Sequence, residues 1–131
     1  MTESIHTQSF NYSQSSKKFF VEKMKGQVRE IFSCAFLDAR YRVICYEDLF
    51  LGSINSMTIH PRIVAQKALE YNAAAIVLGH NHPSGIAKPS EIDKETTKQI
   101  VYILSFLEIR VLDHIIVGED NVFSFAEAGL L

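Results

Sequence analysis

The sequence predicts an α/β domain in which helices flank a mixed central sheet. Three observations indicate this fold class. Helical and strand-like segments follow one another in the order helix, strand, strand, helix, strand, helix, strand, strand. Residues 73–79, AAAIVLG, form a short continuous apolar run, which is typical of a central strand buried on both faces. The chain has 131 residues, of which 47% are hydrophobic and 21% are charged, so it can build one domain around one core.

The N-terminal region is expected to contain a flexible tail and a first helix. Residues 1–12 are rich in Ser, Thr, Gln and Asn, so we expect a tail there and a single domain over 13–131. Residues 13–26 show an amphipathic helical pattern, in which two phenylalanines and a methionine provide the apolar face. Gly26 is expected to end this helix.

Two runs rich in strand-forming residues then predict a β-hairpin. They are VREIFSCAFL at 28–37 and YRVICYEDLFL at 41–51, and the polar stretch between them suits a tight turn. The next helix is expected to begin at Pro61, because the missing N–H of proline costs nothing at the first helical position. This helix ends near Asn72, directly before the apolar run.

The remaining elements follow that buried strand. The loop 81–89 contains two prolines and a glycine, which interrupt regular structure. The longest helical pattern covers 90–107, with isoleucine and leucine at helical spacing. Two further strands are expected at 111–118 and 122–125, joined by the turn 119–121.

Composition and charge limit the classes of protein to which the chain can belong. Its formal net charge is −2 and it has no run of five or more Lys and Arg residues, so the usual electrostatic footprint of nucleic-acid binding is missing. No apolar stretch approaches a membrane span, and the N-terminus has no secretory-signal pattern, so we expect a cytoplasmic protein without a membrane partner. Cys34 and Cys45 are too few for a disulfide scaffold and are expected to be free thiols.

Three polar residues around the loop 81–89 indicate a metal site. His80 and His82 follow the apolar run, and residues i and i+2 of a strand point to the same face, so both imidazoles can converge on one ion. Asp93 lies early in the next helix, and the intervening loop can fold back to bring its carboxylate over the histidines. Two nitrogens and one oxygen leave a fourth position for water, as in a catalytic zinc site.

Some of these residues also have structural interpretations. The stretch SEID beginning at Ser90 fits a capping box, with serine at the N-cap and Asp93 three residues later. The two interpretations are partly compatible, because the serine can cap the helix through one lone pair and still face the site. His114 lies in an apolar strand and is more typical of a structural histidine than of a fourth ligand, which would close the catalytic position.

The spacing H-x-H-x7-S-x2-D, carried by His80, His82, Ser90 and Asp93, matches the pattern of the JAMM (MPN+) metalloprotease domain. The stretches LFLGSINSMTIHPR, NAAAIVLGHNHPSG, PSEID and IRVLDHIIVG, with SFAEAGLL, further resemble the RadC family, a bacterial branch of that superfamily. The resemblance covers roughly 28–131. Longer RadC proteins carry an N-terminal helix-hairpin-helix region associated with DNA, so this chain resembles a short RadC-like protein or an isolated C-terminal domain.

This resemblance implies a cytidine-deaminase-like (JAMM/MPN) α/β fold that binds Zn²⁺ through His80, His82 and Asp93. It also implies a glutamate general base on an earlier strand, for which Glu47 in YEDLFLG is the matching position. The neighbouring Asp48 would point to the opposite face of the strand, so only one of the two carboxylates can face the metal.

The implied chemistry is hydrolysis of an amide bond in a peptide or isopeptide. The metal lowers the pKa of its water, Glu47 takes the proton and delivers it to the leaving nitrogen, and Ser90 donates to the oxyanion. The leading expectation is therefore a zinc-dependent hydrolase with a protein or peptide substrate, in a family labelled DNA repair.

Other functions remain open at this point. One is a non-catalytic partner-binding or DNA-repair accessory domain in which the metal only stabilises the fold. Another is a zinc nucleobase deaminase, although those enzymes use H-x-E with P-C-x-x-C, whereas this chain has H-x-H and no CxxC. Edge strands of a small mixed sheet could also pair two copies into a homodimer.

Overall fold

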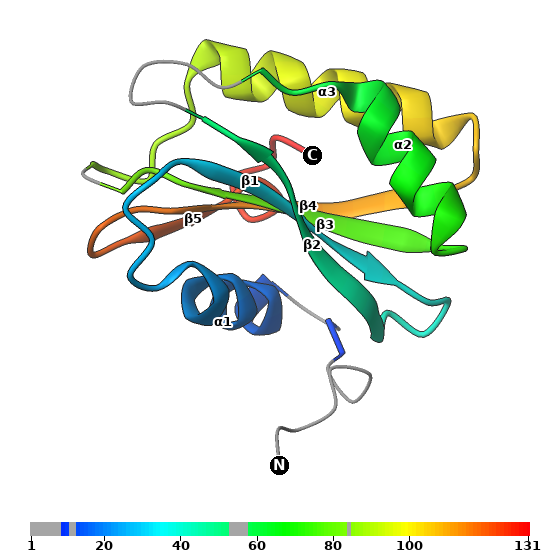
Figure 1. Cartoon of the computed structure of the whole chain (residues 1–131), viewed down its shortest axis with the longest axis horizontal. Helices are drawn as coiled ribbons and strands as arrows, with labels where there is room; N and C mark the ends of the chain where they lie inside the picture. Colours follow the sequence, from blue (N-terminus) through cyan, green and yellow to red (C-terminus); the bar gives the residue numbers. More distant parts are fainter. Residues whose placement is uncertain (1–8, 11–12, 53–57, 84) are drawn as a thin grey trace.

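The computed structural model describes residues 9–10, 13–52, 58–83 and 85–131. Its elements are α1 (Ser13–Met24), β1 (Ile31–Leu37), β2 (Val43–Leu51), α2 (Pro61–Glu70), β3 (Ala75–Asn81), α3 (Glu91–Ser105), β4 (Arg110–Val117) and β5 (Val122–Ser124). In this part of the chain, five strands form one sheet in the order β2-β1-β3-β4-β5. α2 and α3 cover one face of the sheet and α1 covers the other (Figure 1). The predicted element order is confirmed.

The sheet is mixed, as the sequence predicts. β1 pairs antiparallel with β2 and β3, β3 pairs parallel with β4, and β4 pairs antiparallel with β5. β3 therefore lies at the centre of the sheet, and all of its residues are buried. It begins two residues later than the apolar run and continues through His80 to Asn81, because His80 pairs with Phe32 of β1 and Ile116 of β4.

Two apolar cores lie on the two faces of the sheet. The core beneath α2 and α3 includes Phe32, Phe36, Val64, Ala68, Ile76, Leu78, Ile100 and Leu104. The core beneath α1 includes Phe19, Phe20, Met24, Ala35, Leu37, Val77, Ile115 and Val117. Gly79 allows α1 to sit directly on the backbone of β3, because a Cβ at this position would lie 2.3 Å from the ring of Phe20. The residue beside the first candidate ligand is thus held between two packed layers.

The N-terminal segment contributes one side chain to the α1 core. Phe10 is buried, its ring packs edge-on against Phe19 with centroids 5.0 Å apart, and its N–H donates to the carbonyl of Tyr41 at 2.9 Å. The rest of the predicted flexible tail, residues 1–8 and 11–12, lies outside the described residues.

Two expectations from composition concern the chain as a whole. Cys34 is buried and Cys45 is half-buried, and both are free thiols, as predicted. Among the helices that the structure describes, none has the length and the apolar composition needed to cross a membrane.

Candidate metal centre

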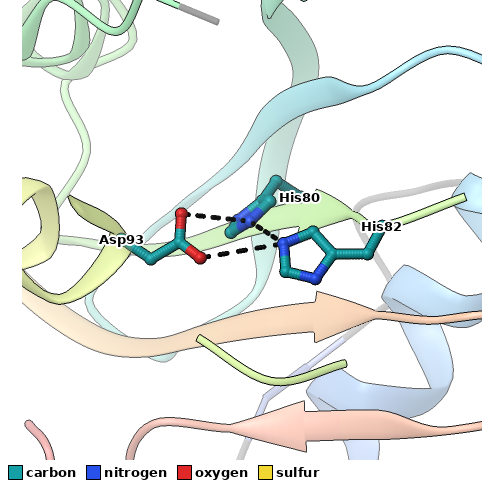
Figure 2. Close-up of side chains that lie close together, drawn as sticks. All are labelled: His80, His82 and Asp93. Atoms are coloured by element: carbon teal, nitrogen blue, oxygen red, sulfur yellow. Dashed lines mark hydrogen bonds and ion pairs between the residues drawn. The ribbon is translucent and has the colours of Figure 1, made fainter. Parts of the chain in front are cut away.

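The carboxyl end of β3 and the first turn of α3 bring His80, His82 and Asp93 together (Figure 2). His80 Nε2 lies 3.0 Å from His82 Nε2 and 3.4 Å from Asp93 Oδ1, and His82 Nε2 lies 3.7 Å from Asp93 Oδ2. Each residue offers one ligand atom, and within the described residues these atoms all lie within 4.8 Å of one another. The three side chains expected to hold a metal are therefore neighbours.

A capping box at the start of α3 holds the carboxylate in place. The Asp93 N–H donates to Ser90 Oγ at 3.0 Å, and the Ser90 N–H donates to Asp93 Oδ2 at 2.8 Å. The second bond fixes the carboxylate at the helix N-terminus, where it also faces the two imidazoles. Both interpretations of Ser90 and Asp93 therefore apply at once: the pair caps the helix and presents a carboxylate to the histidines.

The loop that follows β3 fixes the orientation of the second imidazole. The His82 N–H donates to the carbonyl of Val117 at 2.8 Å, which ties the backbone to the end of β4. His82 Nδ1 lies 3.1 Å from the carbonyl oxygen of Ile86, so Nδ1 carries the proton and Nε2 presents its lone pair to the site. Asn121 accepts a hydrogen bond from the N–H of Ala87 and holds the loop against the β4–β5 turn.

The Asp93 carboxylate and the His82 ring each shift the pKa of the other. Burial alone would raise the pKa of Asp93, but the contacts with His80 and His82 hold that pKa well below the usual range of a carboxyl group. The contact with Asp93 raises the pKa of His82, and the negative charge of Glu30 acts in the same direction. An ionised carboxylate beside two imidazoles is a suitable setting for a divalent cation.

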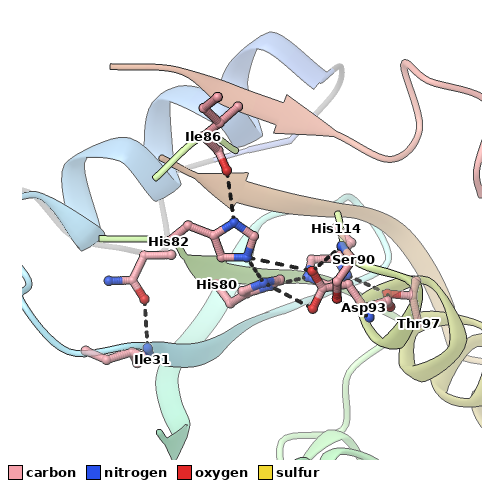
Figure 3. A network of polar contacts seen from close by, with 9 residues as sticks. Ile31, His80, His82, Ile86, Ser90, Asp93, Thr97 and His114 are labelled. Carbon is pink, nitrogen blue, oxygen red and sulfur yellow. Dashed lines mark hydrogen bonds and ion pairs between the residues drawn. The ribbon is translucent and has the colours of Figure 1, made fainter. Parts of the chain in front are cut away.

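A buried hydrogen-bond chain lies behind His80 (Figure 3). His80 Nδ1 lies 2.8 Å from His114 Nε2, and His114 Nδ1 lies 2.6 Å from Thr97 Oγ1. Thr97 Oγ1 also donates to the backbone carbonyl of Asp93 at 2.8 Å. Burial lowers the pKa of His114 well below the usual value, so its ring is neutral. His114 therefore contacts His80 through the Nδ1 atom of His80 and is not one of the clustered ligand groups.

The donor set fits a metal ion. His80 and His82 both use Nδ1 for a polar contact, with His114 and with the carbonyl of Ile86, and their Nε2 atoms lie 3.0 Å apart. The Asp93 carboxylate borders both Nε2 atoms. Imidazole nitrogens and a carboxylate oxygen are the ligand types of zinc and related transition metals, and three protein ligands leave one tetrahedral position open.

The structure places Glu47 away from this cluster. Its carboxylate accepts a hydrogen bond from the Tyr71 hydroxyl and forms an ion pair with Lys67 Nζ at 3.2 Å, both at the end of α2. In the sheet, Glu47 pairs with Cys34, and Cys34 pairs with Leu78 on its other side. Leu78 lies two residues before His80 on β3. The side chain shares the α2–α3 face with the ligands, but its contacts are with α2.

A different glutamate, Glu30, lies just before β1 and is near enough to His82 to act on its pKa. The register that pairs Phe32 with His80 places Glu30 across from His82, and the charge of Glu30 acts on the pKa of His82. The buried side chain of Asn81 fixes this segment, because it accepts from the N–H of Ile31 at 2.7 Å and donates to the carbonyl of the residue before Glu30 at 2.9 Å. The sequence analysis did not consider Glu30, because the family resemblance pointed to Glu47 on the second strand of the hairpin. The antiparallel pairing of the first strand with the histidine strand is the signal that identifies it.

The mixed sheet, its flanking helices and the His-His-Asp group at the end of the central strand define a JAB-type α/β domain. The chain belongs to the RadC-like JAB domain family, whose model matches residues 10–130. This assignment agrees with the resemblance seen in the sequence.

Curated relatives carry the name UPF0758 protein. The protein of Nitrosococcus oceani is 48% identical over 118 residues, which cover 90% of this chain and 53% of the relative. That of Coxiella burnetii is 44% identical over 119 residues, with 91% and 53% covered. That of Thioalkalivibrio sulfidiphilus is 47% identical over 116 residues, with 88% and 52% covered. The chain thus spans about half the length of the curated relatives it matches.

Proposed function

We propose that this chain is a zinc-dependent hydrolase of the JAMM type that cleaves an amide bond in a peptide or isopeptide. The observation that carries the proposal is the clustering of the Nε2 atoms of His80 and His82 with the Asp93 carboxylate, whose ligand atoms lie within 4.8 Å of one another. When bound there, zinc would lower the pKa of a water molecule and polarise the substrate carbonyl. Three protein ligands, His80, His82 and Asp93, are the number found in catalytic zinc sites, whereas structural sites usually have four.

We assign the general base to Glu30 in place of Glu47. Glu30 is half-buried next to His82, and the two Asn81 hydrogen bonds hold its backbone from both sides. From this position its carboxylate would take the proton of the attacking water and return it to the leaving nitrogen. Glu47 is less suitable because Tyr71 and Lys67 occupy both of its carboxylate oxygens.

Ser90 is proposed to stabilise the charge that develops on the carbonyl oxygen. Its Oγ accepts the N–H of Asp93, which uses one lone pair and leaves the hydroxyl proton for donation. The residue is exposed at the N-terminus of α3, two positions before Ile92 and next to the candidate metal ligands. A donor placed there would strengthen its interaction as the carbonyl becomes an oxyanion.

The test combines metal analysis with a survey of cleavage. Purified protein would be stripped with a chelator, reloaded with zinc, and assayed for bound metal and for cleavage of a peptide library by mass spectrometry. We expect about one zinc ion per chain in the wild type and much less in His82→Ala. Glu30→Gln should keep its zinc and lose activity by about 100-fold or more.

Two outcomes would contradict the proposal in different ways. Equal zinc content in the wild type and His82→Ala would refute the ligand assignment. Full activity of Glu30→Gln would refute the role of the base. Zinc binding without cleavage of any peptide or isopeptide would favour the alternative of a partner-binding or DNA-repair accessory domain that is stabilised by its metal.

A further inference from the structure

We infer that Thr97 and His114 are positioning residues that hold His80 in the tautomer whose Nε2 lone pair faces the metal. The inference rests on the metal-binding part of the proposed function and extends it to two residues that touch no substrate or metal. All three side chains are almost fully buried, with exposed fractions of 2% for Thr97, 1% for His114 and 1% for His80. Water is therefore not available to rearrange their protons.

The proton of the Thr97 hydroxyl determines which group donates and which accepts along the hydrogen-bond chain from Thr97 to His80. Thr97 has one hydroxyl proton, and it donates that proton to the backbone carbonyl of Asp93 at 2.8 Å. At 2.6 Å from His114 Nδ1, Thr97 Oγ1 can then only accept. The His114 proton must therefore reside on Nδ1.

The same assignment of protons extends through His114 to the candidate ligand His80. A neutral imidazole has one N–H, so a proton on His114 Nδ1 leaves Nε2 as an acceptor. His114 Nε2 lies 2.8 Å from His80 Nδ1, which must then donate. With its proton on Nδ1, His80 presents an unprotonated Nε2 to His82 and Asp93. Metal-bound histidines are commonly fixed by such a hydrogen bond from the second ring nitrogen.

Thr97 also connects two of the three candidate ligands through one hydroxyl group. It lies one helical turn after Asp93 on α3, and its bond to the Asp93 carbonyl joins the first turn of that helix to the chain that ends at His80. Figure 3 shows the contacts from Thr97 through His114 to His80 as one connected network. Removal of the hydroxyl would leave the His114 Nδ1–H without an acceptor in a buried position. Reversal of the His114 tautomer would then set two N–H groups against each other or move the His80 proton onto Nε2.

The experiment compares zinc affinity in Thr97→Val and Thr97→Ser. Valine has nearly the shape of threonine without the hydroxyl, whereas serine keeps the hydroxyl and loses the methyl group. Zinc dissociation constants would be measured at one fixed pH by competition with a chromophoric chelator. We expect affinity to fall about 10- to 100-fold in Thr97→Val and to stay close to the wild-type value in Thr97→Ser. Circular dichroism of the metal-free proteins would establish that each variant is folded.

A second measurement tests the inference on the unmodified chain. Ring nitrogens of ¹⁵N-labelled zinc-loaded protein would be assigned by long-range ¹H–¹⁵N correlation, and we expect the His114 proton on Nδ1. A His114 proton on Nε2, or equal zinc affinity in the wild type and Thr97→Val, would overturn the inference. Equal losses in Thr97→Val and Thr97→Ser would also overturn it, because packing and not the hydroxyl would then matter. Absence of zinc binding by the wild type would instead refute the proposed function itself.

Discussion

At the scale of single residues, two glutamates on neighbouring strands differ in what their carboxylates contact. Glu47 of β2 interacts with Tyr71 and with Lys67, so it ties the edge strand to the end of α2. The hydrogen bond to Glu47 raises the pKa of Tyr71 well above its usual value, which keeps the hydroxyl a donor at all ordinary pH values. Glu30 precedes β1, and its charge acts on the pKa of His82. Under the proposed function, Glu47 has a structural role and Glu30 has the chemical one.

Glu47→Gln is therefore expected to separate stability from catalysis. An amide keeps the shape of the side chain but loses the ion pair with Lys67 and the charge that binds the Tyr71 hydroxyl. Zinc content and rate of hydrolysis should remain near the wild-type values, while the thermal midpoint should fall by about 2–6 °C. The matched control is Glu30→Gln, which should keep its zinc and its thermal midpoint but lose activity. If Glu47→Gln lost activity but kept both zinc and its thermal midpoint, Glu47 would have to be the base.

The candidate ligands could be predicted from the sequence because they lie close together along the chain. His80, His82 and Asp93 belong to one strand–loop–helix segment, and their side chains and spacing carry enough chemical information to indicate a metal site. Glu30 could not be found in this way. Its place beside His82 depends on the pairing of β1 with β3 and on the bonds made by Asn81, which are long-range features.

At the scale of elements, the start of α3 has two tasks. Ser90 caps the helix and Asp93 both completes the capping box and faces the histidines. The acidic side chain also lies where the helix dipole favours negative charge. The stability of α3 and the geometry of the site are thus coupled through Ser90, Asp93 and the two histidines.

Substitution of Ser90 can distinguish its role as the N-cap of α3 from its proposed role in stabilising the oxyanion. Ser90→Ala should lower the free energy of unfolding by about 0.5–2 kcal/mol, whereas Ser90→Gly should cost only a few tenths of a kcal/mol (~0.3), because glycine is tolerated at the N-cap. Both variants lack the hydroxyl, so both should lose activity by about 100-fold or more if Ser90 stabilises the oxyanion. Urea denaturation and peptide cleavage are the two measurements. Full activity in the glycine variant would leave Ser90 with the capping role alone.

The sequence predicted the elements better than their ends. The strand expected at 73–79 is β3 at Ala75–Asn81, because His80 and Asn81 are polar yet buried through pairing and side-chain hydrogen bonds. Hydrophobicity alone cannot identify such residues as part of a strand. The helix expected at 90–107 is α3 at Glu91–Ser105, and its N-cap at Ser90 was correctly indicated by the capping-box pattern.

At the scale of the whole molecule, the candidate site lies where several elements meet. β3 and α3 provide the ligands, β4 provides His114, and the segment before β1 provides Glu30. On the opposite face, α1 packs on Gly79 next to the first ligand. The mixed α/β fold class was predictable from the order of the elements, but the contacts between layers follow from packing that no local pattern specifies.

Metal removal is expected to destabilise the whole domain. A ligand that binds only the folded chain adds about 2.7 kcal/mol of stability when its free concentration is 100 times the dissociation constant. Thermal unfolding of the wild type should therefore occur at a clearly higher temperature with zinc than with a chelator. His82→Ala serves as the control and should show little difference between the two conditions. A wild-type midpoint that is the same with zinc and with chelator would count against a metal held by the native fold.

The different origins of the ligands and of Glu30 have a consequence for how the site is assembled. All three candidate ligands lie in the segment formed by β3, the loop after it and α3, whereas Glu30 approaches them only when β1 pairs with β3. Under the proposed function, the catalytic arrangement therefore depends on a long-range pairing that the ligand segment alone does not contain.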